Sequence, residues 1–230
     1  MARYYKYKGK NLPSVTTITG QLDKPGLTYW AANACADYMQ EAMDLMSQDN
    51  AFDTRNPFAI FEELRSHVES ARKNFRKVSA QALDTGSAVH HVIEHYLKTG
   101  QEPQAPSEEL LSAFMAFLEW LDLWDSWETI QTEYTVYAER YAGTCDWIVK
   151  LNDKPYLIDF KAAKSIYPEY AYQVAAYRAC DPAIEGCGIL RLDKETGYPE
   201  WKDTSSTYEQ DLEVFKCLVN LWWLRHPNHK

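Results

Sequence analysis

The chain has 230 residues, which suits one ordinary domain or a domain with an insertion. A hydrophobic content of 46%, with eight Trp and sixteen Tyr, excludes a disordered chain. No apolar run approaches the ~20 residues that a membrane span needs, and the first twenty residues lack the apolar core of a signal peptide. We therefore expect a cytoplasmic protein with no membrane partner.

The formal net charge of −9 argues against a nucleic-acid partner, but the charges are unevenly distributed. Residues 101–133 hold eight acidic residues and no Lys or Arg, whereas residues 1–30 and 65–77 are mainly basic. Such a chain can hold a polyanion along its basic segments. It can equally carry these charges as an ordinary solvated surface.

The five cysteines form no CxxC pair and are odd in number. This spacing argues against a zinc ribbon, an iron–sulfur cluster and a secreted disulfide framework. We expect reduced and mostly buried thiols.

The N-terminal segment alternates strand and helix signals. Residues 3–18, rich in Tyr, Val and Thr, predict two short strands around a turn at Gly9–Asn11. A second turn at Pro25-Gly26 precedes a helix from Leu27. Asn56-Pro57 then interrupts the chain, because proline suits the first position of a helix.

Three further helices are predicted before the chain changes its pattern. Apolar residues spaced three and four apart indicate a helix from Phe58 to about Lys77, with a basic outer face. The next helix, Ala88–Lys98, is capped by Asp84–Ser87 and stops at Thr99-Gly100. Ser107 opens the third.

From residue 129 the apolar period changes to two, which predicts strands. The elements expected in this half are strands 129–137, 143–151 and 154–160, a helix 170–180, a strand 187–192, a short strand near Trp201 and a helix 208–225. This order predicts a mixed α/β or α+β fold in one domain, residues 1–230. Residues 1–80 would form a hairpin and helical portion, and residues 84–225 the core.

The stretch GSAVHHVIEHYL, residues 86–97, contains three histidines and a glutamate. In one register, His91, Glu94 and His95 match the HxxEH string of inverted zinc peptidases, but their third ligand cannot be located. In the other, His90 lies one helical turn before Glu94. His91 and His95 point about 100° away from His90, and surface positions account for them better.

A more informative pattern lies on the predicted strands 143–151 and 154–160. Asp159 and Lys161 point to the same face of their strand, whereas Phe160 points to the other, and Asp146 lies on the hairpin partner. Carboxylates are the ligands that Mg²⁺ prefers, and a neighbouring ammonium can stabilise charge on a phosphoryl group. The pattern therefore suits metal-assisted phosphodiester hydrolysis. A bare D-x-K is common at strand edges, but this one lies in an apolar strand.

Four ordered motifs resemble the PD-(D/E)XK nuclease superfamily, and most closely its RecB-like branch. They are Gly86-x-x-x-His90, Gly143-x-x-Asp146, Ile158-Asp159-Phe160-Lys161 and Gln173-x-x-x-Tyr177. Pro13–Ile18 and Lys24–Trp30 are also similar to phage and mitochondrial genome-maintenance exonucleases of this branch. The resemblance implies a restriction-endonuclease-like fold, with a central mixed β-sheet flanked by helices.

Two positions depart from the superfamily pattern. Cys145 replaces its proline, and Asp159 replaces the commoner glutamate. The chain also lacks the cysteine quartet of iron–sulfur relatives, so no iron–sulfur cluster is expected.

The resemblance implies a role for each matched residue. His90, Asp146, Asp159 and the Phe160 carbonyl would hold Mg²⁺, which Mn²⁺ can replace. Lys161 would position the water that attacks the phosphorus. These five residues form the expected catalytic and metal-binding set.

Three more residues would support that set. Gln173 and Tyr177, four apart on one helix, would contact a phosphate or brace the metal site, although plain packing explains them equally well. Glu94 would orient His90 or a water molecule.

The resemblance implies a metal-dependent DNA exonuclease of a bacterium or a phage-infected cell, active in recombination or repair. DNA that is single-stranded or has free ends would be the substrate. Basic residues 65–77 would follow the DNA backbone. A homo-oligomer or a recombination partner protein is left open. The alternatives are a non-catalytic DNA-binding or assembly module and the zinc peptidase.

Overall fold

The structure, a computed structural model, describes residues 3–48, 56–104 and 107–229. The chain divides into two units, one formed by Met1–Leu22 with Thr85–Lys230 and the other by Asp23–Asp84. One helix, α4 (Pro57–Thr99), begins in the second unit and ends in the first. The predicted active-site residues all belong to the first unit.

The second unit consists of helix α2 (Pro25–Gln48) and the first part of α4. The helices are joined by hydrogen bonds from the Cys35 thiol to the Ala71 carbonyl (3.0 Å) and from the Asn74 amide to the Ala34 carbonyl (3.1 Å). The predicted basic outer face of α4 is exposed to solvent at five cations: Arg65, Arg72, Lys73, Arg76 and Lys77.

The predicted cap at residues 84–87 is wrong, because α4 continues through it without a break. Residues 78–83 are mostly good helix formers, and extending an existing helix adds a hydrogen bond for each residue ordered. Keeping the poor helix formers Thr85 and Gly86 inside the helix costs less free energy than ending the helix there and starting a new one. Gly100, with φ +70°, supplies the left-handed residue that follows the true end of α4.

The N-terminal segment forms a hairpin, β1 (Tyr4–Tyr7) and β2 (Lys10–Pro13), followed by helix α1 (Val15–Thr19). Lys8 (φ +48°) and Gly9 (φ +77°) form its two-residue turn, so the predicted turn at 9–11 is placed slightly late.

Residues 15–18 were expected in a strand and are helical instead. The Ser14 hydroxyl accepts a hydrogen bond from the Thr17 amide (2.9 Å). This cap outweighs the strand preference of the β-branched residues that follow it.

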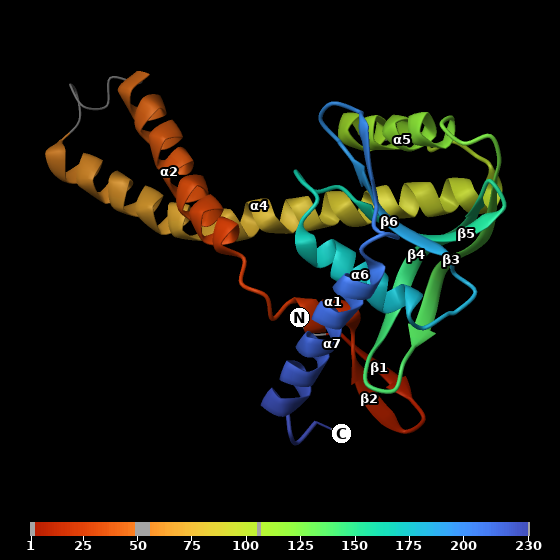
Figure 1. Ribbon diagram of the computed structural model, residues 1–230. Coiled ribbons are helices and arrows are strands. Elements are labelled where there is room, and N and C mark those ends of the chain that lie inside the picture. Colours follow the sequence, from red (N-terminus) through yellow and green to blue (C-terminus); the bar gives the residue numbers. More distant parts are fainter. Residues whose placement is uncertain (1–2, 49–55, 105–106, 230) are drawn as a thin grey trace. The chain divides into compact units, whose positions relative to one another are not determined.

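The first unit is built on a five-stranded mixed sheet, which confirms the predicted fold class (Figure 1). Its strands, in spatial order, are β3 (Trp127–Tyr137), β4 (Ala142–Leu151), β5 (Lys154–Lys161), β6 (Gly186–Leu192) and β7 (Pro199–Asp203). Only the pair β5–β6 is parallel, because helix α6 (Pro168–Arg178) connects these two strands.

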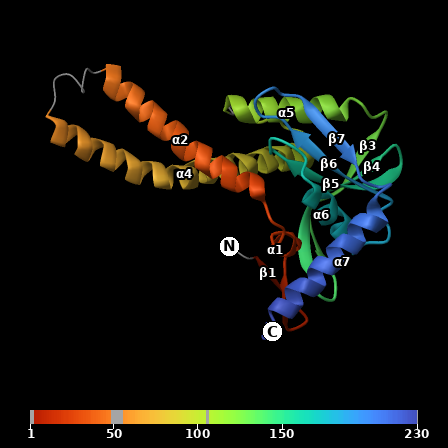
Figure 2. The ribbon, with the colours of Figure 1, turned by 60° about the vertical axis from the view of Figure 1, so that its left-hand side comes forward.

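Helices cover both faces of this sheet (Figure 2). Helices α1, α6 and α7 (Tyr208–Arg225) pack on one face, around Val174, Phe215 and Trp222. The end of α4 and helix α5 (Glu108–Leu121) pack on the other, where Phe117 and Trp120 contact Trp147. Burying both faces explains why the central strands are nearly continuous in apolar residues. Across the described part of the chain, no helix has the length and apolar character needed to cross a membrane.

Gly86 offers a test of the continuous helix. A Cβ atom at this position would meet no atom within 4 Å, and Gly86 has ordinary helical backbone angles. We expect Gly86→Ala to raise the free energy of unfolding by up to about 1 kcal/mol, because alanine is the better helix former. Urea unfolding followed by circular dichroism measures this. A loss of stability would indicate the capping role that the sequence suggests.

Candidate active site

The candidate site lies where the pairing between β4 and β5 ends. The ladder runs from Leu151–Lys154 to Trp147–Ile158, and the next residues on the two strands are Asp146 and Asp159. Beyond the last pair, the Phe160 amide donates to Asp146 Oδ2 (2.8 Å). The Asp146 side chain thus accepts a hydrogen bond that a backbone carbonyl accepts elsewhere in the strand pairing. Both carboxylates lie at the same end of the paired segment.

Asp159 is almost fully buried, with 1% of its surface exposed. The Gln173 side-chain amide donates to its Oδ1 atom (2.8 Å), and Lys161 Nζ lies 2.5 Å from Oδ2. The contact with Lys161 is an ion pair, and no other group is described as donating a hydrogen bond to Oδ2. The opposite orientation of Phe160, which packs against Trp147, confirms the predicted strand alternation.

Gln173 and Tyr177 lie on one face of α6, as their spacing predicts. Besides its bond to Asp159, the Gln173 amide donates to the Tyr177 hydroxyl (3.1 Å), and both side chains are buried. A Cβ atom at Gly143 would lie 2.3 Å from Tyr177 Cε1. The glycine of the Gly143-x-x-Asp146 motif therefore leaves room for the ring that supports Gln173.

His90 and Asp146 form a second part of the site together with Glu133, a residue that belongs to none of the four sequence motifs. His90 Nδ1 lies 3.5 Å from Asp146 Oδ1. One ligand atom from each of His90, Glu133 and Asp146 lies within 4.8 Å of the others, an arrangement that could hold a metal ion. In the described part of the chain, no other group of three His, Cys, Asp or Glu residues meets this criterion.

Glu133 reaches this position through strand pairing. It lies on β3 between the pairs Thr132–Trp147 and Tyr134–Cys145, and therefore opposite Asp146. Its φ of +49° is unusual for a residue other than glycine. In the sequence, Glu133 is one of eight acidic residues between positions 101 and 133. Only its register opposite Asp146 distinguishes it from the other seven.

Glu94, His91 and His95 are not members of this ligand group. The Glu94 carboxylate pairs with Lys98 and lies 3.7 Å from His91 Nδ1, and no contact between Glu94 and His90 is present among the described interactions. The His91 side chain is 81% exposed, and His95 is also exposed. This geometry gives the HxxEH register no support.

Burial shapes the acid–base properties of two carboxyl groups. It raises the pKa of Asp159 to about 6, with Lys161 opposing the shift and Asp146 adding to it. Burial also raises the pKa of Glu133, and the nearby charges of Asp146 and Glu94 add to the effect. Both groups therefore lie in surroundings that disfavour negative charge.

Charged partners determine the direction of the pKa shift at His90, Asp146 and Lys161. Burial alone would raise the pKa of Asp146, but His90, Lys161 and the Phe160 amide lower it overall. Burial alone would lower the pKa values of His90 and Lys161, but Asp146 and Asp159 raise both. Lys161 is thus kept as a charged ammonium.

The donor set fits a divalent cation. His90, Glu133 and Asp146 offer one imidazole and two carboxylates, which suit Mn²⁺, and carboxylates also suit Mg²⁺. The buried Asp159 Oδ2 atom, which contacts the Lys161 ammonium, could add a further oxygen. Asp159 itself is not within the three-residue group, because its carboxylate faces Lys161 and Gln173.

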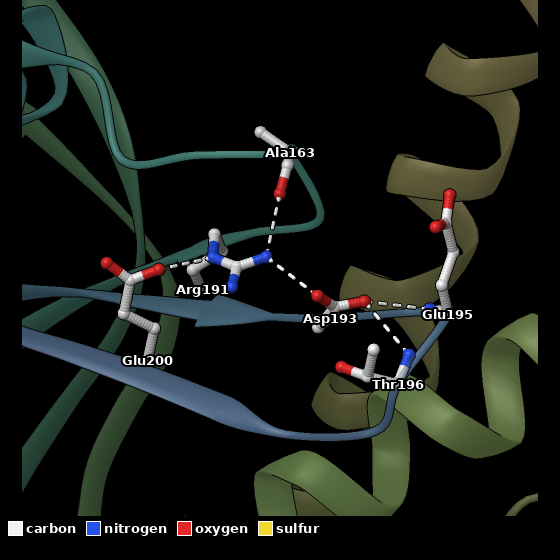
Figure 3. A network of polar contacts seen from close by, with 6 residues as sticks. All are labelled: Ala163, Arg191, Asp193, Glu195, Thr196 and Glu200. Carbon is white, nitrogen blue, oxygen red and sulfur yellow. Dashed lines mark hydrogen bonds and ion pairs between the residues drawn. The ribbon is translucent and has the colours of Figure 1, made fainter.

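A polar network around Arg191 holds the backbone that follows Lys161 (Figure 3). Arg191 is the pairing partner of Lys161 on β6. Its guanidinium donates to Glu200 (2.6 Å), to Asp193 (3.1 Å) and to the Ala163 carbonyl (3.4 Å). The contact with Ala163 connects this network to the segment between Lys161 and α6.

Asp193 is itself held by the turn that follows it (Figure 3). Its Oδ1 atom accepts hydrogen bonds from the Glu195 amide (2.9 Å) and the Thr196 amide (3.0 Å). These backbone bonds, helped by Arg191, lower the pKa of Asp193 to about 2. The carboxylate therefore stays ionised and keeps Arg191 in place.

Neither a protein-family model nor a curated protein matches the chain. Among solved structures, the protein SSO0001 is similar over 50% of this chain, with 17% identity and a TM-score of 0.28. The similarity spans 62% of SSO0001, less than two thirds of its length. An alkaline exonuclease of Laribacter hongkongensis, LHK-Exo, is similar over 61% of this chain and 84% of its own, with 14% identity and a TM-score of 0.33. At this level of similarity, function has to be inferred from the chain's own residues.

Gly143→Ala tests the close approach of Tyr177. The added methyl group would force the buried ring to move, so we expect a loss of about 1–3 kcal/mol in the free energy of unfolding. Denaturant unfolding measures it. Tyr177→Val removes the ring that the added methyl group would displace. The double variant should therefore lose less free energy of unfolding than the sum of the two single losses. Wild-type stability in Gly143→Ala would contradict the contact.

The lowered pKa of Asp193 predicts a pH-dependent stability. The contribution of the ionised Asp193 to the free energy of unfolding is fully present above the ordinary pKa of 3.8. It is lost as the pH falls through about 2. We therefore expect Asp193→Asn to lower the melting temperature by a constant amount above about pH 5. The difference from wild type should shrink as the pH falls further. A difference that grows on acidification would contradict the assignment.

Proposed function

We propose that the protein is a metal-dependent DNA nuclease that hydrolyses phosphodiester bonds. The observation that carries the proposal is the ligand group of His90, Glu133 and Asp146, close to the buried pair of Asp159 and Lys161. The order of the four sequence motifs supports the same reading. A buried carboxylate that is paired with a partly buried lysine is costly to maintain, which favours a functional role over a structural one.

His90, Glu133, Asp146 and Asp159 would hold the cation, with the Phe160 carbonyl added by the motif resemblance. When bound, a divalent cation supplies charge neutralisation at the phosphoryl group and a lower pKa for a bound water. Mg²⁺ would serve, and Mn²⁺ would replace it well because of the imidazole. Asp146 is held in place for this role by the Phe160 amide.

Lys161 would act as a fixed positive charge. Its pKa is raised by Asp159 and Asp146 against the effect of burial, so its ammonium donates hydrogen bonds and does not accept a proton. It can orient a water for attack and stabilise negative charge that develops on the phosphate. Gln173, supported by Tyr177, orients the Asp159 carboxylate beside it.

The proposed substrate is DNA that is single-stranded or has free ends, degraded as an exonuclease would in recombination or repair. The exposed cations of α4, such as Arg72 and Arg76, would attract the phosphate backbone. They can do so despite the net charge of −9, because residues 65–77 hold five cations and a single acidic residue, Glu69.

Digestion of end-labelled single- and double-stranded DNA with Mg²⁺, Mn²⁺ or EDTA tests the proposal. We expect cleavage with either metal and none with EDTA. Lys161→Ala should reduce cleavage by about 100-fold or more while leaving Mn²⁺ binding and DNA binding largely intact. His90→Ala and Glu133→Gln should instead weaken Mn²⁺ binding, measured by isothermal titration calorimetry.

His91→Ala is the matched control, because His91 is the exposed neighbour of His90. It should retain wild-type cleavage. DNA binding with no cleavage under any metal condition would favour a non-catalytic module. If His91→Ala abolished activity and His90→Ala spared it, the chosen histidine register would be wrong.

A further inference from the structure

Tyr167 occupies an unusual position at the start of α6. It is the N-cap residue of the helix, yet its side chain makes no capping hydrogen bond, unlike that of Ser107 at the start of α5. Tyrosine is not among the residues that favour this position. The residue is 45% exposed, so neither capping nor core packing accounts for it.

The Tyr167 ring lies close to the candidate site. Its centroid is 5.7 Å from that of Tyr170, and the two rings meet nearly edge to face at 82°. Lys161 Nζ lies over the Tyr170 ring, 4.8 Å from its centroid. Tyr170 is partly buried against the core, so it connects the exposed Tyr167 ring to the ammonium that pairs with Asp159.

We propose that Tyr167, supported by Tyr170, stacks on an unpaired nucleobase next to the phosphate at Lys161. A nucleotide carries an anionic phosphate and a flat aromatic base a short distance apart. Lys161 and Tyr167 present a matching cation and exposed aromatic ring. Base stacking on aromatic side chains tolerates any base, because every base has a π-face.

This inference rests on the proposed nuclease function and refines its substrate. In a duplex, the faces of a base are covered by its neighbours, so only an unpaired base can stack on Tyr167. The platform therefore selects single strands or frayed ends. It requires no base-specific hydrogen bond, so the preference should be independent of base identity.

Tyr167→Ala, Tyr167→Phe and Tyr198→Ala form the test set. Tyr198, 67% exposed and directly before β7, is a matched surface tyrosine. Binding is measured in EDTA with short single-stranded and blunt duplex oligodeoxynucleotides, by fluorescence anisotropy. A 2-aminopurine placed at successive positions of the single strand reports stacking by its quenching. Thermal melting shows whether each variant is folded.

For single strands, we expect Tyr167→Ala to weaken binding between about 5-fold and 150-fold and to remove the quenching at one position. Tyr167→Phe should behave like wild type, because stacking needs the ring and not the hydroxyl. Tyr198→Ala should also match wild type, and duplex binding should change little in any variant.

Three results would overturn the inference. They are wild-type single-strand binding by Tyr167→Ala, equal losses for single strands and duplex, and a loss in Tyr167→Phe as large as in Tyr167→Ala. In each case, metal-dependent cleavage by the wild type would leave the proposed function standing. If the wild type neither bound nor cleaved DNA, the nuclease proposal would fail and this inference with it.

Discussion

The buried carboxylate of Asp159 is the constraint on which the first unit depends. An isolated charge at 1% exposure would be very costly, and Lys161 and Gln173 offset that cost from two elements, β5 and α6. The position of α6 in turn depends on Tyr177, whose ring fills the space left by Gly143 on β4. One charged group therefore links two strands and a helix, and the geometry of the site cannot change without changing the packing.

The balance of charge around Asp159 explains why the site suits a cation. The carboxylates of Asp146 and Asp159 interact with the permanent positive charge of Lys161, Glu133 interacts with that of Arg3, and His90 can add a further charge. The raised pKa values of Asp159 and Glu133 show that the surroundings resist further negative charge. The proposed function would account for such an arrangement, because polar groups at functional sites commonly cost stability.

Local patterns predicted most of the elements of the first unit. Alternation and turn residues located all five strands of the main sheet, and the closing helix was placed at its observed bounds, Tyr208–Arg225. The errors arose where two local signals competed. At residues 84–87, capping residues suggested a helix end, but the energetic advantage of extending a helix prevailed. At residues 15–18, strand-forming side chains lost to the capping bond of Ser14.

The sequence by itself determined which groups share a face of one element. Asp159 and Lys161 follow from the period of a strand, and Gln173 and Tyr177 from the turn of a helix. Only the tertiary structure brought Glu133 to His90 and Asp146 and turned Asp159 toward Lys161 and Gln173. The physical reason is that these contacts depend on the register between strands and on the packing of helices against them. That information lies in interactions between distant residues, and no local period contains it.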